Sequence, residues 1–202
     1  MQSAWLARAY ERWWRPVLFA ITTGFGAPTA TEEARRVLGL IEPTRGPWLD
    51  LSCGPGTLLR HLAPPGASSG ARPIVGVDLS LAMLRRARMA APAARLVRAD
   101  AAELPFADGA FGAVVNLAAL DLYPDPQRVV GECARVLAPG GRWVCSTFVA
   151  PSKAPDRSVF VAASGVRTPT LSELEAWARG AGLLHFGHVL FRRYAVAWAD
   201  RA

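Results

Sequence analysis

The sequence predicts an α/β fold, an open, doubly wound sheet of seven strands that is mostly parallel and ends in an antiparallel hairpin. Two observations predict it. From residue 48 onward, short apolar segments alternate with segments of helical periodicity, which is the pattern of consecutive βαβ units. The last two apolar segments follow each other with no helical segment between them, so they can pair as a hairpin.

Seven apolar segments are the expected strands. The first five are short, and most are followed by turn residues or by a helical segment. The last two form the expected hairpin. The seven ranges are 48–51, 74–78, 95–100, 113–117, 142–148, 184–191 and 194–198.

Helical segments precede and connect these strands. Thr29 or Thr31 can cap the helix before the first strand, and Ser80 can cap the helix after the second. Ser172 to Glu175 has the spacing of a capping box. The helices are expected over 3–21 with a bend near residue 16, and over 32–40, 57–62, 80–90, 126–137 and 172 to 180 or 182.

Length and composition indicate one domain. A chain of 202 residues, 51% of them hydrophobic, can bury a sizeable core, which excludes a disordered or fibrous protein. We expect an N-terminal helical segment over 1–30 that covers the site and a main domain over 31–202. No apolar run reaches the roughly 18 residues of a membrane span.

The formal net charge of +7 would suit a nucleic-acid or anionic partner. All 23 basic residues except Lys153 are arginine, however, a skew typical of GC-rich coding sequences. The arginines are also spread from Arg8 to Arg201 rather than gathered in one stripe. We therefore expect no nucleic-acid partner.

Three cysteines, Cys53, Cys133 and Cys145, form neither an even set nor a CxxC pair. The pattern fits neither a disulfide framework nor a zinc site, so we expect no metal and reduced thiols in a cytoplasmic protein. The N-terminus also lacks the layout of a signal peptide.

The topology locates the candidate site. Ligands bind open α/β sheets at the carboxyl ends of the strands, near the point where the strand order reverses. The strands that lead to this point end near Ser52, Asp78, Asp100 and Asn116.

Residues at these strand ends suit a nucleoside. Gly54 and Gly56 open a helix after the first strand, so backbone N–H groups can approach a ligand closely. Asp78 can accept hydrogen bonds from two ribose hydroxyls, and Asp100 can accept one from an adenine amino group. The structural alternative is that the two glycines only form a tight turn and the two aspartates only cap loops. That alternative does not require these residues to follow successive strands in the order that a nucleoside needs.

Four segments resemble the motifs of class I S-adenosylmethionine-dependent methyltransferases. Residues 49–57 resemble the first motif, 75–80 the second-strand motif, 98–111 the third-strand and loop motif, and 135–141 the turn into the fifth strand. The combination is closest to the small-molecule branch that includes ubiquinone and menaquinone biosynthesis enzymes. The resemblance implies a Rossmann-like fold over roughly 35–200.

The resemblance also implies binding of S-adenosyl-L-methionine, with S-adenosyl-L-homocysteine as the product. Asp50 would support the methionine end, Asp78 would bind the ribose, and Asp100 with the backbone of Ala101 would read the adenine edge. The other implied contacts are Ser52 and Cys53 in the loop, Gly54 and Gly56 against the methionyl part, Leu79 on the adenine, and Asn116 and Leu117 near the sulfonium.

A nicotinamide-dependent dehydrogenase is the nearest competitor, because it shares the strand–turn–helix and the ribose acid. The third glycine of its fingerprint would fall at Leu59, so that fingerprint fails.

Five residues are candidates for the wall of the acceptor site. Tyr10, Trp13 and Trp14 can cover it from the N-terminal helix, and Asp121 and Tyr123 follow the fourth strand. Tyr10, Asp121 and Tyr123 are also the catalytic candidates, although methyl transfer needs a general base only when the nucleophile must lose a proton. Packing of the tryptophans on the sheet and capping of the loop by Asp121 and Tyr123 are the structural alternatives.

We therefore expect a methyltransferase that acts on a small aromatic or hydrophobic acceptor. Because the segment 150–171 is short for this family, we expect the pocket to be closed by the N-terminal segment or by another subunit. One alternative is an S-adenosylmethionine-binding protein without catalysis. The other is a membrane-surface-associated methyltransferase acting on a quinone or lipid-like acceptor, with peripheral contact through the arginines and tryptophans of residues 3–21.

Overall fold

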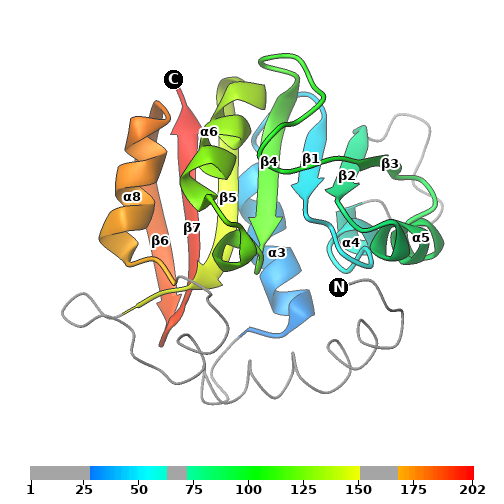
Figure 1. Ribbon diagram of the computed structural model, residues 1–202, viewed down its shortest axis with the longest axis horizontal. Helices are drawn as coiled ribbons and strands as arrows, with labels where there is room; N and C mark the ends of the chain where they lie inside the picture. The colour runs from blue at the N-terminus through cyan, green and yellow to red at the C-terminus, as the bar shows by residue number, and fades with distance from the viewer. Residues whose placement is uncertain (1–27, 63–71, 151–167) are drawn as a thin grey trace.

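The computed structural model describes residues 28–62, 72–150 and 168–202. Its strands form one seven-stranded sheet in the order β3-β2-β1-β4-β5-β7-β6 (Figure 1). The strands are β1 (Trp48–Leu51), β2 (Ile74–Asp78), β3 (Arg95–Arg98), β4 (Phe111–Leu117), β5 (Leu137–Phe148), β6 (Leu183–Phe191) and β7 (Tyr194–Arg201). β1 to β5 pair in parallel, and β7 pairs antiparallel with β5 and β6. The predicted fold class, including the terminal hairpin, is confirmed.

Helices cover both faces of the sheet (Figure 1). One core joins the sheet to α6 and α8, and a second core joins the opposite face to α3, α4 and α5. The helices are α3 (Ala30–Ile41), α4 (Leu59–Leu62), α5 (Leu81–Ala90), α6 (Pro126–Val136) and α8 (Leu171–Gly180), with the 3₁₀ turn η2 (Leu120–Leu122). The resulting three layers bury β1 and β4 at the centre, where both strands are almost wholly inaccessible.

Two helix caps lie where the sequence placed them, and one does not. The side chains of Thr29 and Ser80 accept hydrogen bonds from the first turns of α3 and α5. The capping box of α8 is formed by Thr170 and Glu173, not by the expected Ser172 and Glu175. The two pairs have the same spacing, and Glu175 is instead paired with Arg179 one turn later at 2.7 Å.

The start of β5 also differs from the prediction. The helix expected over 126–137 ends at Val136, because Leu137 already pairs with Phe111 at the start of β4. The register then shifts before Ala113 pairs with Arg142, and Gly140 takes a φ of +74° within this irregular stretch. The turn residues 139–141, which were predicted to end the helix, thus belong to β5.

The expected helix over 3–21 and nearly all of the segment 1–30 lie outside the described residues. The division of the chain at residue 30 therefore stays a prediction. Of the helices that the structure describes, none has the length and hydropathy to cross a bilayer.

Candidate cofactor and active site

The strand order reverses between β1 and β4, so the switch point lies at their carboxyl ends. The chain takes a left-handed conformation just beyond each end, with φ of +57° at Ser52 and +50° at Ala118. Such a backbone costs about 1–3 kcal/mol at a non-glycine residue and is typical of functional sites. At Ala118 the backbone N–H donates to both the carbonyl oxygen and Oγ of Ser146, at 2.8 and 3.1 Å, which holds this turn in place.

The carboxylate of Asp78 ties the loop after β1 to the start of α5. Its Oδ2 accepts a hydrogen bond from the Gly54 N–H at 2.9 Å, and its Oδ1 accepts one from the Ser80 N–H at 2.8 Å. A carboxylate offers about four acceptor positions, so Asp78 keeps capacity for further donors. Gly54 has a φ of +54°, and no atom lies within 4 Å of the position that a Cβ would take there.

Gly56 and Cys53 face the protein interior instead. A Cβ on Gly56 would lie 3.0 Å from the Cα of Ala87 and 3.3 Å from the Cβ of Ala90, so this glycine permits close packing on α5. Cys53 is buried, and burial raises the pKa of its thiol. Both have a structural role in the loop, and their contact with a cofactor stays a prediction.

Asp50 is a buried carboxyl group without a partner at one of its oxygens. The residue is 2% exposed, and among the residues that the structure describes none donates a hydrogen bond to Oδ2. Burial, with the nearby charge of Asp78, raises the pKa of Asp50 well above its usual range. A buried carboxylate of this kind needs either a proton or a cationic donor. It therefore suits a ligand that carries an ammonium group.

The residues expected at the adenine lie at the ends of β2 and β3. Leu79 is 62% exposed, which is unusual for a leucine directly after a buried strand. Asp100 is exposed, and its Oδ1 accepts a hydrogen bond from the Ala102 N–H at 2.9 Å, while Ala101 is buried. This arrangement offers an uncovered apolar surface beside acceptor groups.

Three polar side chains connect β1, β4 and η2. Asn116, fully buried, donates from Nδ2 to the carbonyl of Leu51 at 3.0 Å and to the hydroxyl of Tyr123 at 2.8 Å. The same hydroxyl lies 2.6 Å from Oγ of Ser52. Burial raises the pKa of Tyr123, so its phenol stays protonated at neutral pH. Tyr123 thus clamps the loop after β1 to the end of β4, which agrees with its structural alternative.

Of the other candidates for the acceptor wall, the structure describes only Asp121. Asp121 lies on η2 and is half-buried, and burial raises the pKa of its carboxyl against the opposing hydrogen bonds from its own backbone and Thr147. Leu117, which was expected near the sulfonium of the cofactor, is half-buried at the end of β4. Tyr10, Trp13 and Trp14 lie outside the described residues, so their place at the site stays a prediction.

One buried network near this end of the sheet escaped the sequence interpretation. The hydroxyl of Tyr194 donates to Oε1 of Glu33 at 2.6 Å and lies 2.6 Å from Oγ of Ser146. Through Ser146 the network reaches the strained turn at Ala118. The sequence does contain an indication of this network. Glu33 precedes Val37 by four residues and so lies on the buried face of α3, where a carboxylate needs a partner.

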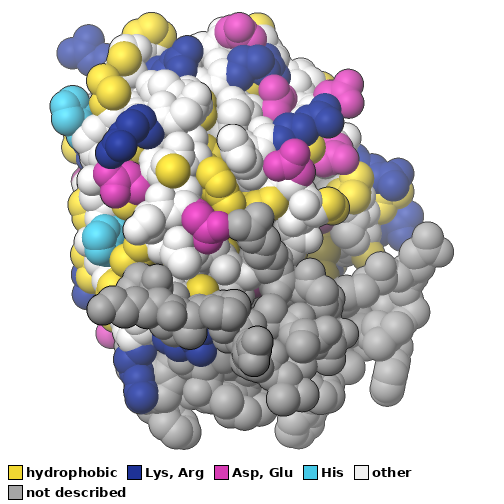
Figure 2. Space-filling view, turned by 60° about the vertical axis from the view of Figure 1, so that its left-hand side comes forward, with side chains coloured by type: hydrophobic (Ala, Val, Ile, Leu, Met, Phe, Trp, Pro, Cys, Tyr) yellow, Lys and Arg dark blue, Asp and Glu magenta, His cyan; other side chains and the backbone are white. Residues whose placement is uncertain are grey.

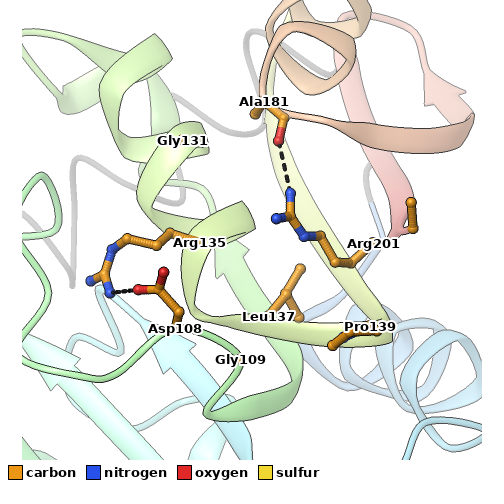
Figure 3. A pocket seen from close by; sticks show the side chains of 9 residues that line it. Asp108, Gly109, Gly131, Arg135, Leu137, Pro139, Ala181 and Arg201 are labelled. Atoms are coloured by element: carbon orange, nitrogen blue, oxygen red, sulfur yellow. Dashed lines mark hydrogen bonds and ion pairs between the residues drawn. The ribbon is translucent and has the colours of Figure 1, made fainter.

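A cavity of about 500 Å³ lies at the opposite end of the strands from the switch point (Figure 3). It is bordered by the start of β5, the end of β7, Gly131 and Arg135 of α6, and Ala181. Its arginines already have partners: Arg135 pairs with Asp108 at 2.7 Å, and Nη1 of Arg201 donates to the carbonyl of Ala181. None of the sequence-predicted site residues lines it.

Known methyltransferases are similar to this chain in sequence. Residues 49–145 match the family model of the methyltransferase domain. Over 111 residues the chain is 42% identical to the demethylmenaquinone methyltransferase of Thermus thermophilus, a match that covers 52% of this chain and 48% of that protein. Residues 49–145 are a class I S-adenosylmethionine-dependent methyltransferase domain. The chain spans between 45% and 60% of the length of the curated demethylmenaquinone methyltransferases that it matches.

Solved structures of methyltransferases share the fold at low sequence identity. A possible histamine N-methyltransferase from Thermotoga maritima superposes with a TM-score of 0.70 at 19% identity, over 98% of both chains. The geranyl diphosphate C-methyltransferase from Streptomyces coelicolor superposes with a TM-score of 0.72 at 18% identity, over 85% of this chain and 79% of that one. Among the described residues of this methyltransferase, no three acidic, histidine or cysteine side chains are grouped to hold a metal ion.

Proposed function

We propose that this methyltransferase moves the methyl group of S-adenosyl-L-methionine to a small aromatic or hydrophobic acceptor. The observation that carries the proposal is the cradle at the ends of β1 and β2. There Asp78 retains acceptor capacity beside the left-handed Gly54, while Oδ2 of the buried Asp50 has no partner. A ligand with an ammonium group and a ribose diol would satisfy both carboxyl groups.

The residues present fit the cofactor of the family. Asp50 would receive the ammonium of its methionine part, and Asp78 would accept the ribose hydroxyls. Leu79 would pack on the adenine, with Asp100 and Ala101 at the edge of that ring. When bound, the cofactor supplies a methyl group on a sulfonium, with a neutral thioether as the leaving group.

The chain itself would contribute orientation and exclusion of water, which is most of what such a displacement requires. The clamp formed by Ser52, Asn116 and Tyr123 fixes the two strand ends that face the reacting atoms. Tyr123 keeps its proton at neutral pH, so it acts as a positioning residue and not as a base. If the acceptor must lose a proton, Asp121 is the better candidate, because its raised pKa makes the carboxylate a stronger base.

The relatives support the chemical class of the acceptor. One matched relative is named for demethylmenaquinone, an aromatic and lipid-like acceptor, and one structural neighbour was solved with geranyl diphosphate and S-adenosyl-L-homocysteine. Both names are consistent with an apolar acceptor here. If the protein only binds the cofactor and does not catalyse methyl transfer, it would bind S-adenosyl-L-homocysteine but give no turnover with any acceptor.

Cofactor binding can be tested by calorimetry with S-adenosyl-L-homocysteine. Asp78→Ala should weaken binding at least about tenfold, because the ribose loses a charged acceptor and the loop loses its tie to Gly54. Asp108→Ala removes an exposed carboxylate far from the switch point and should bind as the wild type does. Equal affinity of the two variants would contradict the site. Turnover is then assayed with naphthoquinol and prenyl acceptors, using labelled methyl groups.

A further inference from the structure

The edge of the molecule formed by α5 and β3 has an unusual charge. Residues 79–99 contain five arginines and no acidic residue, so they carry +5 of the chain's net charge of +7. The flanking Asp78 and Asp100 accept hydrogen bonds from backbone N–H groups. The arginines as a class are spread over the whole sequence. Packing of α5 beside β3 is what gathers these five at one edge (Figure 1).

Two exposed arginines of this edge, Arg88 and Arg98, are positioned by backbone carbonyl groups rather than by carboxylates. Nε of Arg98 donates to the carbonyl of Leu79 at 2.9 Å, and Nη1 of Arg88 donates to the carbonyl of Ala94 at 3.0 Å. Within the described ranges, Arg85 and Arg95 also take no part in an ion pair. Since a guanidinium has five N–H donors, these groups keep both their charge and most of their donors.

The face that carries α8 is different. There basic and acidic side chains are intermixed (Figure 2). Arg179 of α8 is paired with Glu175. The described part of α8 thus carries side chains of both signs, whereas residues 79–99 carry basic side chains without acidic ones.

Apolar side chains accompany these cations on the outer face of α5. Leu84 and Ala87 face the core. Met89 is 85% exposed and Leu81 is 48% exposed, and helical spacing places both on the same outer face as Arg85. A cationic face with exposed apolar tips is typical of helices that bind the surface of an anionic bilayer.

We propose that the outer face of α5, together with Arg95 and Arg98 of β3, is a docking surface for an anionic lipid bilayer. Nucleic acid would be attracted by the same arginines, but it would gain nothing from Leu81 and Met89. The surface is separate from residues 3–21, and it does not depend on methyl transfer. Because α5 starts directly after Asp78 and Leu79, a bilayer on this face would lie beside the candidate site, where an apolar acceptor would be concentrated.

Co-sedimentation with vesicles tests the proposal on the full chain. Wild type should bind phosphatidylcholine vesicles that contain about one third phosphatidylglycerol, and binding should disappear at about 0.5 M salt. The double variant Arg85→Gln/Arg95→Gln should bind about 25-fold more weakly, at roughly fivefold for each arginine near the surface. Met89→Ser should lower binding about threefold, because it removes an apolar tip without changing the charge.

A matched control separates this surface from net charge. The variant Arg45→Gln/Arg192→Gln also removes two exposed arginines, but neither lies on α5 or β3, and it should bind vesicles as the wild type does. Equal loss in the two double variants, or no binding of the wild type, would overturn the proposal. Binding of random-sequence RNA that depends on Arg85 and Arg95 but not on Met89 would assign the surface to nucleic acid instead.

Discussion

Asp50 makes the free protein less stable as the pH rises. Below about pH 4, the ordinary range of an aspartate in an unfolded chain, its carboxyl is protonated in both states. Between that pH and its raised folded pKa, the unfolded state has lost the proton and the folded state still binds it. The free energy of unfolding therefore falls with rising pH through this window. A cationic ligand would offset this effect, which couples stability to cofactor binding at a single residue.

Asp50→Asn tests this coupling, because an amide does not ionise. The stability of the variant relative to the wild type should increase from pH 4 upward, by at most about 1.4 kcal/mol per pH unit, in denaturant unfolding of the free protein. The same change should weaken binding of S-adenosyl-L-homocysteine at least about tenfold, since the ammonium loses a charged partner. The exposed Glu42→Gln serves as the control. A stability difference that does not change with pH would contradict the explanation.

The turn η2 acts on the site through one hydroxyl group. In Tyr123→Phe, Asn116 loses one acceptor and Ser52 loses its partner, so we expect a loss of about 1–2 kcal/mol in the free energy of unfolding. The affinity for S-adenosyl-L-homocysteine should fall with it, because the loop after β1 is no longer tied to β4. A variant with wild-type stability and affinity but no turnover would show instead that the phenol acts in catalysis.

The contact between α3 and the hairpin gives a second prediction for an element. Tyr194→Phe leaves the buried carboxyl of Glu33 without its donor and should cost about 1–3 kcal/mol in denaturant unfolding. Glu33→Gln keeps an acceptor for the same hydroxyl and should cost less. If Glu33→Gln is as strongly destabilised as Tyr194→Phe, a neutral acceptor does not replace the carboxylate, and the charge of Glu33 is what this hydrogen bond requires.

The elements differ in how far the sequence could predict them. Strands β1, β2 and β4 are apolar apart from one polar residue at or next to the carboxyl end, Asp50, Asp78 and Asn116, so local pattern suffices to locate both the strands and these residues. The cap of α8 was misplaced because two threonine- or serine-to-glutamate pairs of equal spacing overlap there. The link between Glu33 and Tyr194 joins residues 161 positions apart, and only the packed sheet brings them together.

At the scale of the whole molecule, the three cysteines differ in whether they lie in the core or in a loop. Cys133 lies on α6 and Cys145 on β5, each almost fully buried in the core, whereas Cys53 lies in the loop that faces the candidate site. Burial raises the pKa of all three thiols, so reaction with a thiol reagent requires that the structure opens. Opening of a loop needs less free energy than global unfolding.

Labelling with a thiol reagent, read by mass spectrometry of the peptides, should therefore separate the three sites. We expect Cys53 to react first, and Cys133 and Cys145 to react later with a common rate set by global unfolding. S-adenosyl-L-homocysteine at about 100 times its dissociation constant should stabilise the loop by about 2.7 kcal/mol and slow Cys53 about a hundredfold. Because the unfolded chain does not bind the ligand either, Cys133 and Cys145 should slow to a similar degree, while Cys53 still reacts first. Equal rates of the three thiols without ligand would show that the loop does not open independently. Protection of Cys133 alone would contradict a ligand site at the ends of β1 and β4.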